Sequence, residues 1–167
     1  MRGNQRFRQQ EPKGIERSNS EMSTMTKEPV LLDANNQILG RLASYAAKHA
    51  LSGNEVIVLN AEKAVISGRR KNIVEEAKRR LKTRTLANQT TAPVHQRRPD
   101  LYFRRVVRGM LPWKKAKGKA AFHRVIVFMG VPEEYSSKTA VKVAGADASK
   151  LGTPYITLAD LATEIGG

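Results

Sequence analysis

Residues 55–61 read EVIVLNA, and this short stretch decides the fold class. An uninterrupted run of branched apolar residues is typical of a strand that is covered on both faces of a parallel sheet. Residues 30–34, VLLDA, predict another buried strand. Between the two, residues 38–51 place apolar side chains at helical spacing and predict a helix that ends at Ser52 and Gly53. A strand, a helix and a strand at this spacing form a βαβ unit with parallel strands.

The rest of the chain continues the mixture of strands and helices. Residues 62–68, EKAVISG, predict an irregular or helical connector, and residues 124–128, RVIVF, predict a third strand. Residues 71–83 and 101–111 predict two helices, and Thr157 is expected to cap a last one. We therefore expect an α/β fold: a three-layer α/β/α arrangement with a mostly parallel sheet of about four strands, plus basic loop and helix extensions.

Both middle helices carry an apolar stripe that we expect to face the core. The stripes consist of Ile73, Val74, Ala77 and Leu81 in the first helix, and of Phe103, Val107, Met110 and Leu111 in the second. Between these helices, residues 84–100 have no periodicity and contain two prolines, which predicts a long loop. Loops of this length in compact domains are commonly functional.

The first 28 residues differ in composition from the remainder. Residues 1–28 are polar and contain few apolar side chains, so we expect a flexible N-terminal extension before a single α/β domain over residues 29–167. Met22 and Met25 offer alternative starts. Acidic residues within the extension disfavour a targeting peptide. No apolar stretch is long enough to cross a bilayer, so we expect no membrane partner.

Positive charge is concentrated in the middle third of the chain. The whole sequence carries 30 Lys and Arg against 15 Asp and Glu, a formal net charge of +15. Residues 69–124 alone hold eighteen basic and three acidic side chains, so this segment also has a net charge of +15. Self-repulsion of this size opposes compaction, and a bound polyanion would neutralise it. The alternative is a basic face kept for solubility, which mixed signs or an acidic excess usually serve better.

Composition and spacing exclude several kinds of site. The chain has no cysteine, which excludes disulfides, thiolate metal sites and a cysteine nucleophile. The three histidines are widely spaced and lie near no carboxylate cluster, so we expect no metal and no cofactor. The turn after the first strand, DANNQILG, lacks the glycines and the lysine of nucleotide-binding loops. We interpret Asp33 in this turn as a turn-capping residue, and we expect no catalytic residue.

Basic side chains at five places are candidates for phosphate binding. They are Arg69, Arg70 and Lys71 at the start of a helix; Arg79, Arg80 and Arg84 along and after it; Arg97 and Arg98 in the long loop; Arg104, Arg105 and Arg108 on the next helix; and Lys114, Lys115, Lys117 and Lys119 beyond it. Trp113 could stack on an unpaired base or anchor the core. Charge on a loop and a broken helix, without a recognisable DNA-binding motif, favours irregular folded RNA.

Several stretches occur together in an order that is specific to one family. They are LGRLAS (39–44), VIVLNAEKAVISG (56–68), RRVVRGMLPWK (104–114), VFMGVP (127–132) and YITLADLA (155–162). In this combination the chain resembles the large-subunit ribosomal protein L13 family, in its archaeal and eukaryotic form, over about residues 30–165.

The resemblance implies a structural component of the large ribosomal subunit and no enzymatic activity. It implies binding to large-subunit rRNA, contacts with neighbouring large-subunit ribosomal proteins, a role in subunit assembly and a cytoplasmic location on the ribosome. We expect no homo-oligomer. Carried over by position, Arg108 and Lys114 would bind rRNA phosphates, Gly109 would permit close backbone approach, and Met110 would pack. Arg41, in the stretch 39–44, would be a further RNA-facing residue.

Two other functions stay open from the residues alone. The first is an α/β enzyme that acts on a nucleotide or a nucleic acid, although no phosphate-binding loop is visible. The second is a regulatory RNA-binding module that works away from the ribosome, and this function could coexist with a ribosomal one.

Overall fold

Three parallel strands form the main sheet. The computed structural model describes residues 29–167 apart from 86 and 89, so the expected N-terminal extension lies outside the described residues. Strands β1 (Val30–Asp33), β2 (Val56–Leu59) and β4 (Val125–Val127) are ordered β1-β2-β4. All four residues of the central strand β2 are buried. The prediction of a strand covered on both faces is therefore confirmed.

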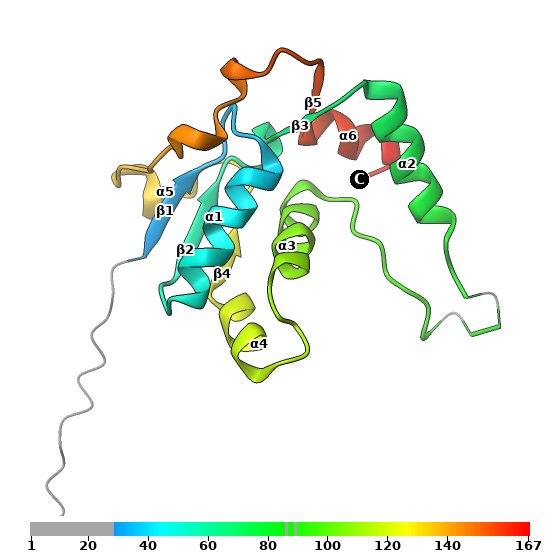
Figure 1. Ribbon diagram of the computed structural model, residues 1–167, viewed down its shortest axis with the longest axis horizontal. Coiled ribbons are helices and arrows are strands. Elements are labelled where there is room, and N and C mark those ends of the chain that lie inside the picture. Colours follow the sequence, from blue (N-terminus) through cyan, green and yellow to red (C-terminus); the bar gives the residue numbers. More distant parts are fainter. Residues whose placement is uncertain (1–28, 86, 89) are drawn as a thin grey trace, which may run out of the picture.

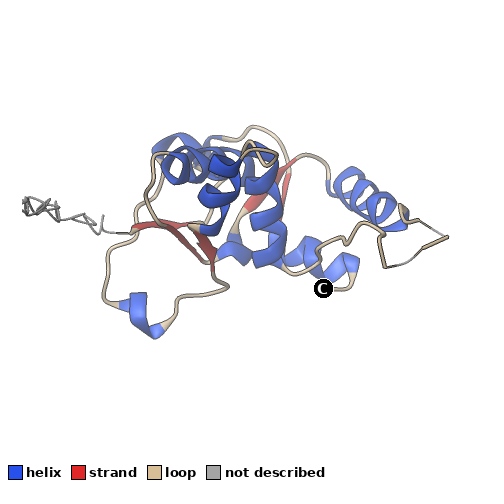
Figure 2. Ribbon diagram, turned by 90° about the horizontal axis from the view of Figure 1, so that it is seen from below, coloured by secondary structure: helices blue, strands red, loops and turns tan. Residues whose placement is uncertain are grey.

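Helices cover one face of this sheet, and a thinner layer covers the other. Figure 2 shows α1 (Leu39–Leu51), α3 (Pro99–Met110) and α4 (Ala116–His123) on one side of the strands and α5 (Glu133–Ser136) on the opposite side. Alternate strand residues point to the two faces. One set joins the main core with α1 and α3, while Leu31, Ile57 and Leu59 pack with Tyr135 of α5 and with Phe128. The α/β class is confirmed.

A second, antiparallel sheet accounts for a strand that the sequence did not predict. Residues 62–68 are not simply a connector, because a 3-10 turn at Ala61–Lys63 leads into β3 (Val65–Ser67). This strand pairs with β5 (Tyr155–Thr157), far along the chain, and a three-residue strand has too little pattern to be read without its partner. Within the described residues, the strands thus form a parallel sheet of three and a separate antiparallel pair.

The C-terminal elements close the core beside this second sheet. Two short 3-10 turns, Ala144–Ala146 and Ala148–Lys150, precede β5. Helix α6 (Leu158–Ile165) follows, and the Thr157 hydroxyl accepts a hydrogen bond from the Asp160 N–H at 3.1 Å. The prediction that Thr157 caps the last helix is confirmed. Leu158, Leu161 and Ile165 of this helix are buried in the main core.

Helix α2 (Arg70–Lys82) lies at one end of the molecule, and the described residues of the loop between it and α3, which are 83–98 without 86 and 89, run beside it (Figure 1). Its predicted apolar stripe is only partly correct. Val74 is its one buried residue, whereas Ile73, Ala77 and Leu81 are half-buried. Helix α2 packs mainly against α6, so its apolar face is incompletely covered.

The stripe of α3 also needs one correction. Phe103 and Val107 are fully buried, and Leu111 is buried, as predicted. Met110 does not pack in the core, because its side chain is 40% exposed and its sulfur accepts a hydrogen bond from the Ser44 hydroxyl at 3.4 Å. Met110 is the last residue of α3, where the helix leaves the sheet.

The turn that follows β1 is held by the side chain of Asp33. Its Oδ1 atom accepts hydrogen bonds from the backbone N–H of Asn35 at 3.0 Å and from the side-chain amide of Asn60 at 2.9 Å. Asn36 takes the left-handed conformation in the same turn, with φ of 58°. The interpretation of Asp33 as a turn-capping residue is therefore confirmed.

Candidate nucleic-acid interface

Two arginines of α3 lie over aromatic rings. The guanidinium carbon of Arg108 is 4.0 Å from the centroid of the Trp113 ring, and that of Arg104 is 4.9 Å from the centroid of Phe122. The two rings meet edge to face, with centroids 5.2 Å apart and an interplanar angle of 89°. Stacking of this kind leaves the edges of a guanidinium group able to bind phosphate.

This arrangement depends on the way the chain reverses after α3. Pro112 follows the end of the helix, and the turn brings Trp113 back beneath Arg108. Helix α4 then runs close enough that Gly118 touches the Pro112 carbonyl, where a Cβ atom would lie 2.1 Å from the oxygen. Trp113 is half-buried between an arginine and Phe122, so its ring acts as a support for Arg108.

The four candidate lysines extend the arginine cluster onto the turn and α4. Lys114, Lys115, Lys117 and Lys119 are all exposed. Across residues 29–167 without 86 and 89, none of these lysines has an ion-pair partner within the chain. Their charges are therefore free to meet an external anion.

Helix α2 carries both paired and unpaired cations. Arg70 and Lys78 contact Glu164 of α6, at 2.8 and 3.8 Å, while Lys71 pairs with Glu75 at 3.9 Å. The hydrogen bond from Arg70 raises the pKa of that arginine and lowers the pKa of Glu164. The pairs of α2 to Glu164 tie the helix to α6.

Other cations of α2 are less constrained. Arg80 pairs with Glu76 one turn earlier in the same helix. Arg69, Arg79 and Arg84 are exposed, and the described part of the chain offers them no ion pair. The predicted anion site at the start of α2 is therefore occupied in part by the carboxylate of Glu164, through Arg70.

The loop that joins α2 to α3 is fixed at its second half. The Arg97 guanidinium donates to the carbonyl of Gly166 at 3.3 Å, and Arg98 pairs with Asp100 at 3.0 Å. A ring nitrogen of His95 lies 3.0 Å from the Thr83 carbonyl, across the loop. These contacts hold the second half of the loop in place beside α3, and both Arg97 and Arg98 are exposed there.

Arg41 is the one candidate outside residues 69–124. It is exposed on α1 and donates a hydrogen bond to the carbonyl of Gly145 at 3.0 Å. This contact ties α1 to the segment that precedes β5, and it leaves other donors of the guanidinium group for an anion.

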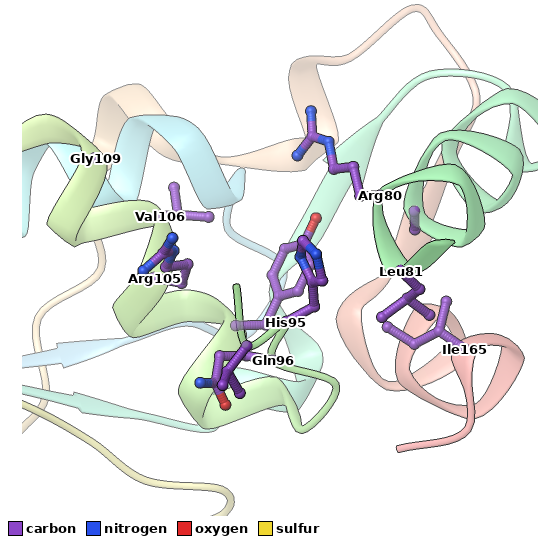
Figure 3. Close-up of a pocket in the computed structure, with 11 residues that line it drawn as sticks. Arg80, Leu81, His95, Gln96, Arg105, Val106, Gly109 and Ile165 are labelled. Atoms are coloured by element: carbon purple, nitrogen blue, oxygen red, sulfur yellow. The ribbon is translucent and has the colours of Figure 1, made fainter. Parts of the chain in front are cut away.

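A cavity of about 360 Å³ lies between α2, α3, α6 and the intervening loop. Figure 3 shows side chains from all of these elements facing one another across it. Its walls include the half-covered apolar face of α2 and the exposed cations Arg80 and Arg105. Burial raises the pKa of the Tyr102 hydroxyl, which also lines the cavity.

Sequence reasoning missed two residues that organise this surface, Phe122, which supports Arg104, and Glu164, which holds α2. Tyr102 has the same two interpretations from the sequence as Trp113, base stacking or core packing, and the structure places it in the cavity wall. The only signal for Glu164 is its position on the last helix, because its partner Arg70 is 94 residues away. Phe122 offers a weak signal, since it is the one aromatic residue between Trp113 and the third strand of the sheet.

The described residues include no set of three or more His, Asp or Glu side chains that could hold a metal ion. Among the helices of the described residues, none has the length and apolar character needed to cross a membrane. The described residues thus form an α/β domain with two arginines over aromatic rings, four exposed lysines beside them, and a separate cavity with Arg80 and Arg105 in its lining. Exposed cations concentrated in this way are typical of proteins that bind polyanions.

Comparisons with known proteins identify the family. The model of the family described as ribosomal protein L13 matches residues 27–134. The chain is 43% identical over 143 residues to large ribosomal subunit protein uL13 of Methanopyrus kandleri, which covers 84% of this chain and 88% of that protein. The proteins of the same name from Methanococcoides burtonii and Sulfurisphaera tokodaii are 43% and 40% identical, over 81% and 86% of this chain and 96% and 98% of their own. The chain belongs to the ribosomal protein L13 family, whose members are structural proteins and not enzymes.

Proposed function

We propose that this chain is a structural constituent of the large ribosomal subunit, where it binds large-subunit rRNA through the basic segment 69–124 of a single α/β domain. The relatives from archaea carry the name of a large-subunit protein and align over most of the chain, which supports the location on the ribosome. In this role the domain supports subunit assembly, contacts neighbouring large-subunit proteins and acts as a single copy.

The observation that carries the rRNA proposal is the net charge of +15 within residues 69–124. Eight candidate side chains in this segment are exposed and have no ion-pair partner in the part of the chain that the structure describes; they are Arg69, Arg79, Arg84, Arg105, Lys114, Lys115, Lys117 and Lys119. An RNA backbone supplies regularly spaced phosphates that would neutralise them. Folded RNA suits cations on a loop, a turn and three different helices better than a straight duplex does.

Crosslinking in growing cells tests this proposal. Ultraviolet light joins the chain to bound RNA, the attached RNA is sequenced, and the crosslinked peptides are mapped by mass spectrometry. We expect large-subunit rRNA to dominate, with the peptides falling within residues 69–124. Recovery of messenger RNA alone, or of peptides confined to residues 125–167, would overturn the proposal.

A further inference from the structure

We propose that the cavity between α2 and α3 receives one unstacked base of the bound RNA, an inference that rests on the proposed function. The cavity has a volume of about 360 Å³, which falls within the range of sites that hold small organic groups. It opens among the cations of segment 69–124, where an RNA strand would already be held.

The walls of the cavity suit a planar group with polar edges. Ala77, Leu81, Val106 and Ile165 supply an apolar surface, and the Tyr102 and His95 rings supply faces on which a base can stack. Figure 3 shows Leu81 and Ile165 on one side of the space and Val106 on the other, with His95 between them.

Hydrogen-bonding groups in the wall indicate that the occupant is not purely apolar. The side-chain amide of Gln96 and the hydroxyl of Tyr102 make no hydrogen bond with any other described residue. A base presents donors and acceptors along its edges, so it can pair with both groups. An inserted aliphatic side chain would leave them unsatisfied.

Charge at the rim indicates that the occupant is attached to an anion. Arg80 and Arg105 both line the cavity and are exposed to solvent. Arg105 has no ion pair within the described residues, and Arg80 pairs only with Glu76 of its own helix. A nucleotide places its base in the cavity and its phosphate at the rim, where these guanidinium groups lie.

Gly109 leaves room at one wall of the cavity for the backbone of a bound RNA strand. A Cβ atom at this position would meet nothing within 4 Å, although Gly109 lies in a helix where alanine would be preferred. The absence of a side chain there has no explanation in the packing of the chain itself. It is explained if the sugar-phosphate backbone of the inserted nucleotide passes over this residue.

Filling the cavity tests the inference without changing any charge. The Val106→Trp variant of the full chain is compared with wild type for binding to protein-free large-subunit rRNA over a series of salt concentrations. Loss of one stacked base predicts affinity lower by roughly tenfold to a hundredfold, with an unchanged salt dependence because no phosphate contact is lost. The matched control is Val141→Trp, at an exposed site outside the basic segment, which should bind like wild type.

The outcomes separate this inference from the proposed function. Wild type that fails to bind protein-free rRNA overturns both. Equal affinities of wild type and Val106→Trp for protein-free rRNA would overturn the base site alone. If that variant were then excluded from assembled subunits, the occupant of the cavity would be a neighbouring protein.

A second measurement does not depend on the folding of a variant. Short-wavelength ultraviolet light joins stacked bases directly to adjacent rings, so the wild-type complex should give a crosslink to Tyr102 or His95. Crosslinks to rRNA that spare both residues overturn the inference.

Discussion

The guanidinium carbon of Arg108 lies 4.0 Å from the centre of the Trp113 ring, so the only tryptophan of the chain supports an arginine of the basic segment. An unsupported arginine loses much rotamer freedom when it binds a phosphate. Stacking on a ring fixes the guanidinium plane before the phosphate arrives, so less freedom is lost on binding. If Arg108 binds an rRNA phosphate, as we propose, Trp113 acts through Arg108 as a positioning residue.

Removing the ring should weaken rRNA binding although no charge is lost. We expect Trp113→Ala to lower affinity by about two- to fivefold, the value of one exposed cation–π contact, and Trp113→Phe to keep most of the affinity. Filter binding at fixed salt measures both, with circular dichroism as the control for folding. Equal affinities in all three proteins would mean that Arg108 needs no aromatic support.

Only part of this surface could be predicted from the sequence, because some of its contacts follow from helical spacing and others depend on how the chain folds back after α3. Helical spacing alone predicts that Arg104 and Arg108, four residues apart, lie on one row of α3. Their aromatic partners could not be predicted, because Trp113 and Phe122 reach that row only through the reversal at Pro112.

The same distinction applies to the fold. The run EVIVLNA predicts a fully covered strand because its pattern is local and complete, and β2 confirms it. Strand β3 could not be predicted, because it has only three residues and is a strand through its pairing with β5, near the other end of the chain. The half-buried stripe of α2 differs from its prediction for a related reason, since α6 covers only part of it.

Gly118 should tolerate no side chain. A Cβ atom would lie 2.1 Å from the Pro112 carbonyl oxygen, and neither backbone can move without separating α4 from the turn after α3. We expect Gly118→Ala to reduce the free energy of unfolding by about 1–3 kcal/mol or more, as overpacking does. Urea denaturation measures the change, and a variant as stable as wild type would show that the turn can relax freely.

Gly109 should behave in the opposite way. Its Cβ position is open and the residue is helical, so Gly109→Ala should raise the stability of the free protein by up to ~1 kcal/mol. The same change should weaken rRNA binding, because the methyl group faces the cavity. Stability and affinity measured on one preparation separate the two effects, and unchanged affinity would mean that no backbone approaches this residue.

Charge in the turn and α4 should govern the salt dependence of binding. Changing Lys114, Lys115, Lys117 and Lys119 together to Gln removes up to four phosphate contacts, so the slope of log K against log salt should become shallower by roughly 3. The matched control changes Lys48, Lys63, Lys138 and Lys150, which are also exposed, lie outside the basic segment and make no ion pair with any described residue. Equal slopes for the two variants would show that only total charge matters.

The attachment of α2 to α6 depends on the charge of Glu164. Its carboxylate binds Arg70 at 2.8 Å and Lys78 at 3.8 Å, and the hydrogen bond from Arg70 holds the pKa of Glu164 below its ordinary value. A carboxyl group whose pKa is lower in the folded state stabilises the fold above its unfolded pKa, and this stabilisation disappears as the pH falls through the folded pKa.

Glu164→Gln should therefore be slightly less stable than wild type near neutral pH and equally stable in acid. Thermal melting of both proteins between neutral and acid pH measures the difference in stability. Hydrogen exchange should show faster opening of α2 in the variant, because Glu164 holds this helix. The control Glu133→Gln removes the same charge from α5, where no ion pair is present among the described residues. At acid pH the carboxyl group of Glu164 is protonated and neutral, like the amide of glutamine, so the two proteins should have equal free energies of unfolding. A difference that persists at acid pH would mean that Glu164 stabilises the protein through packing and not through its charge.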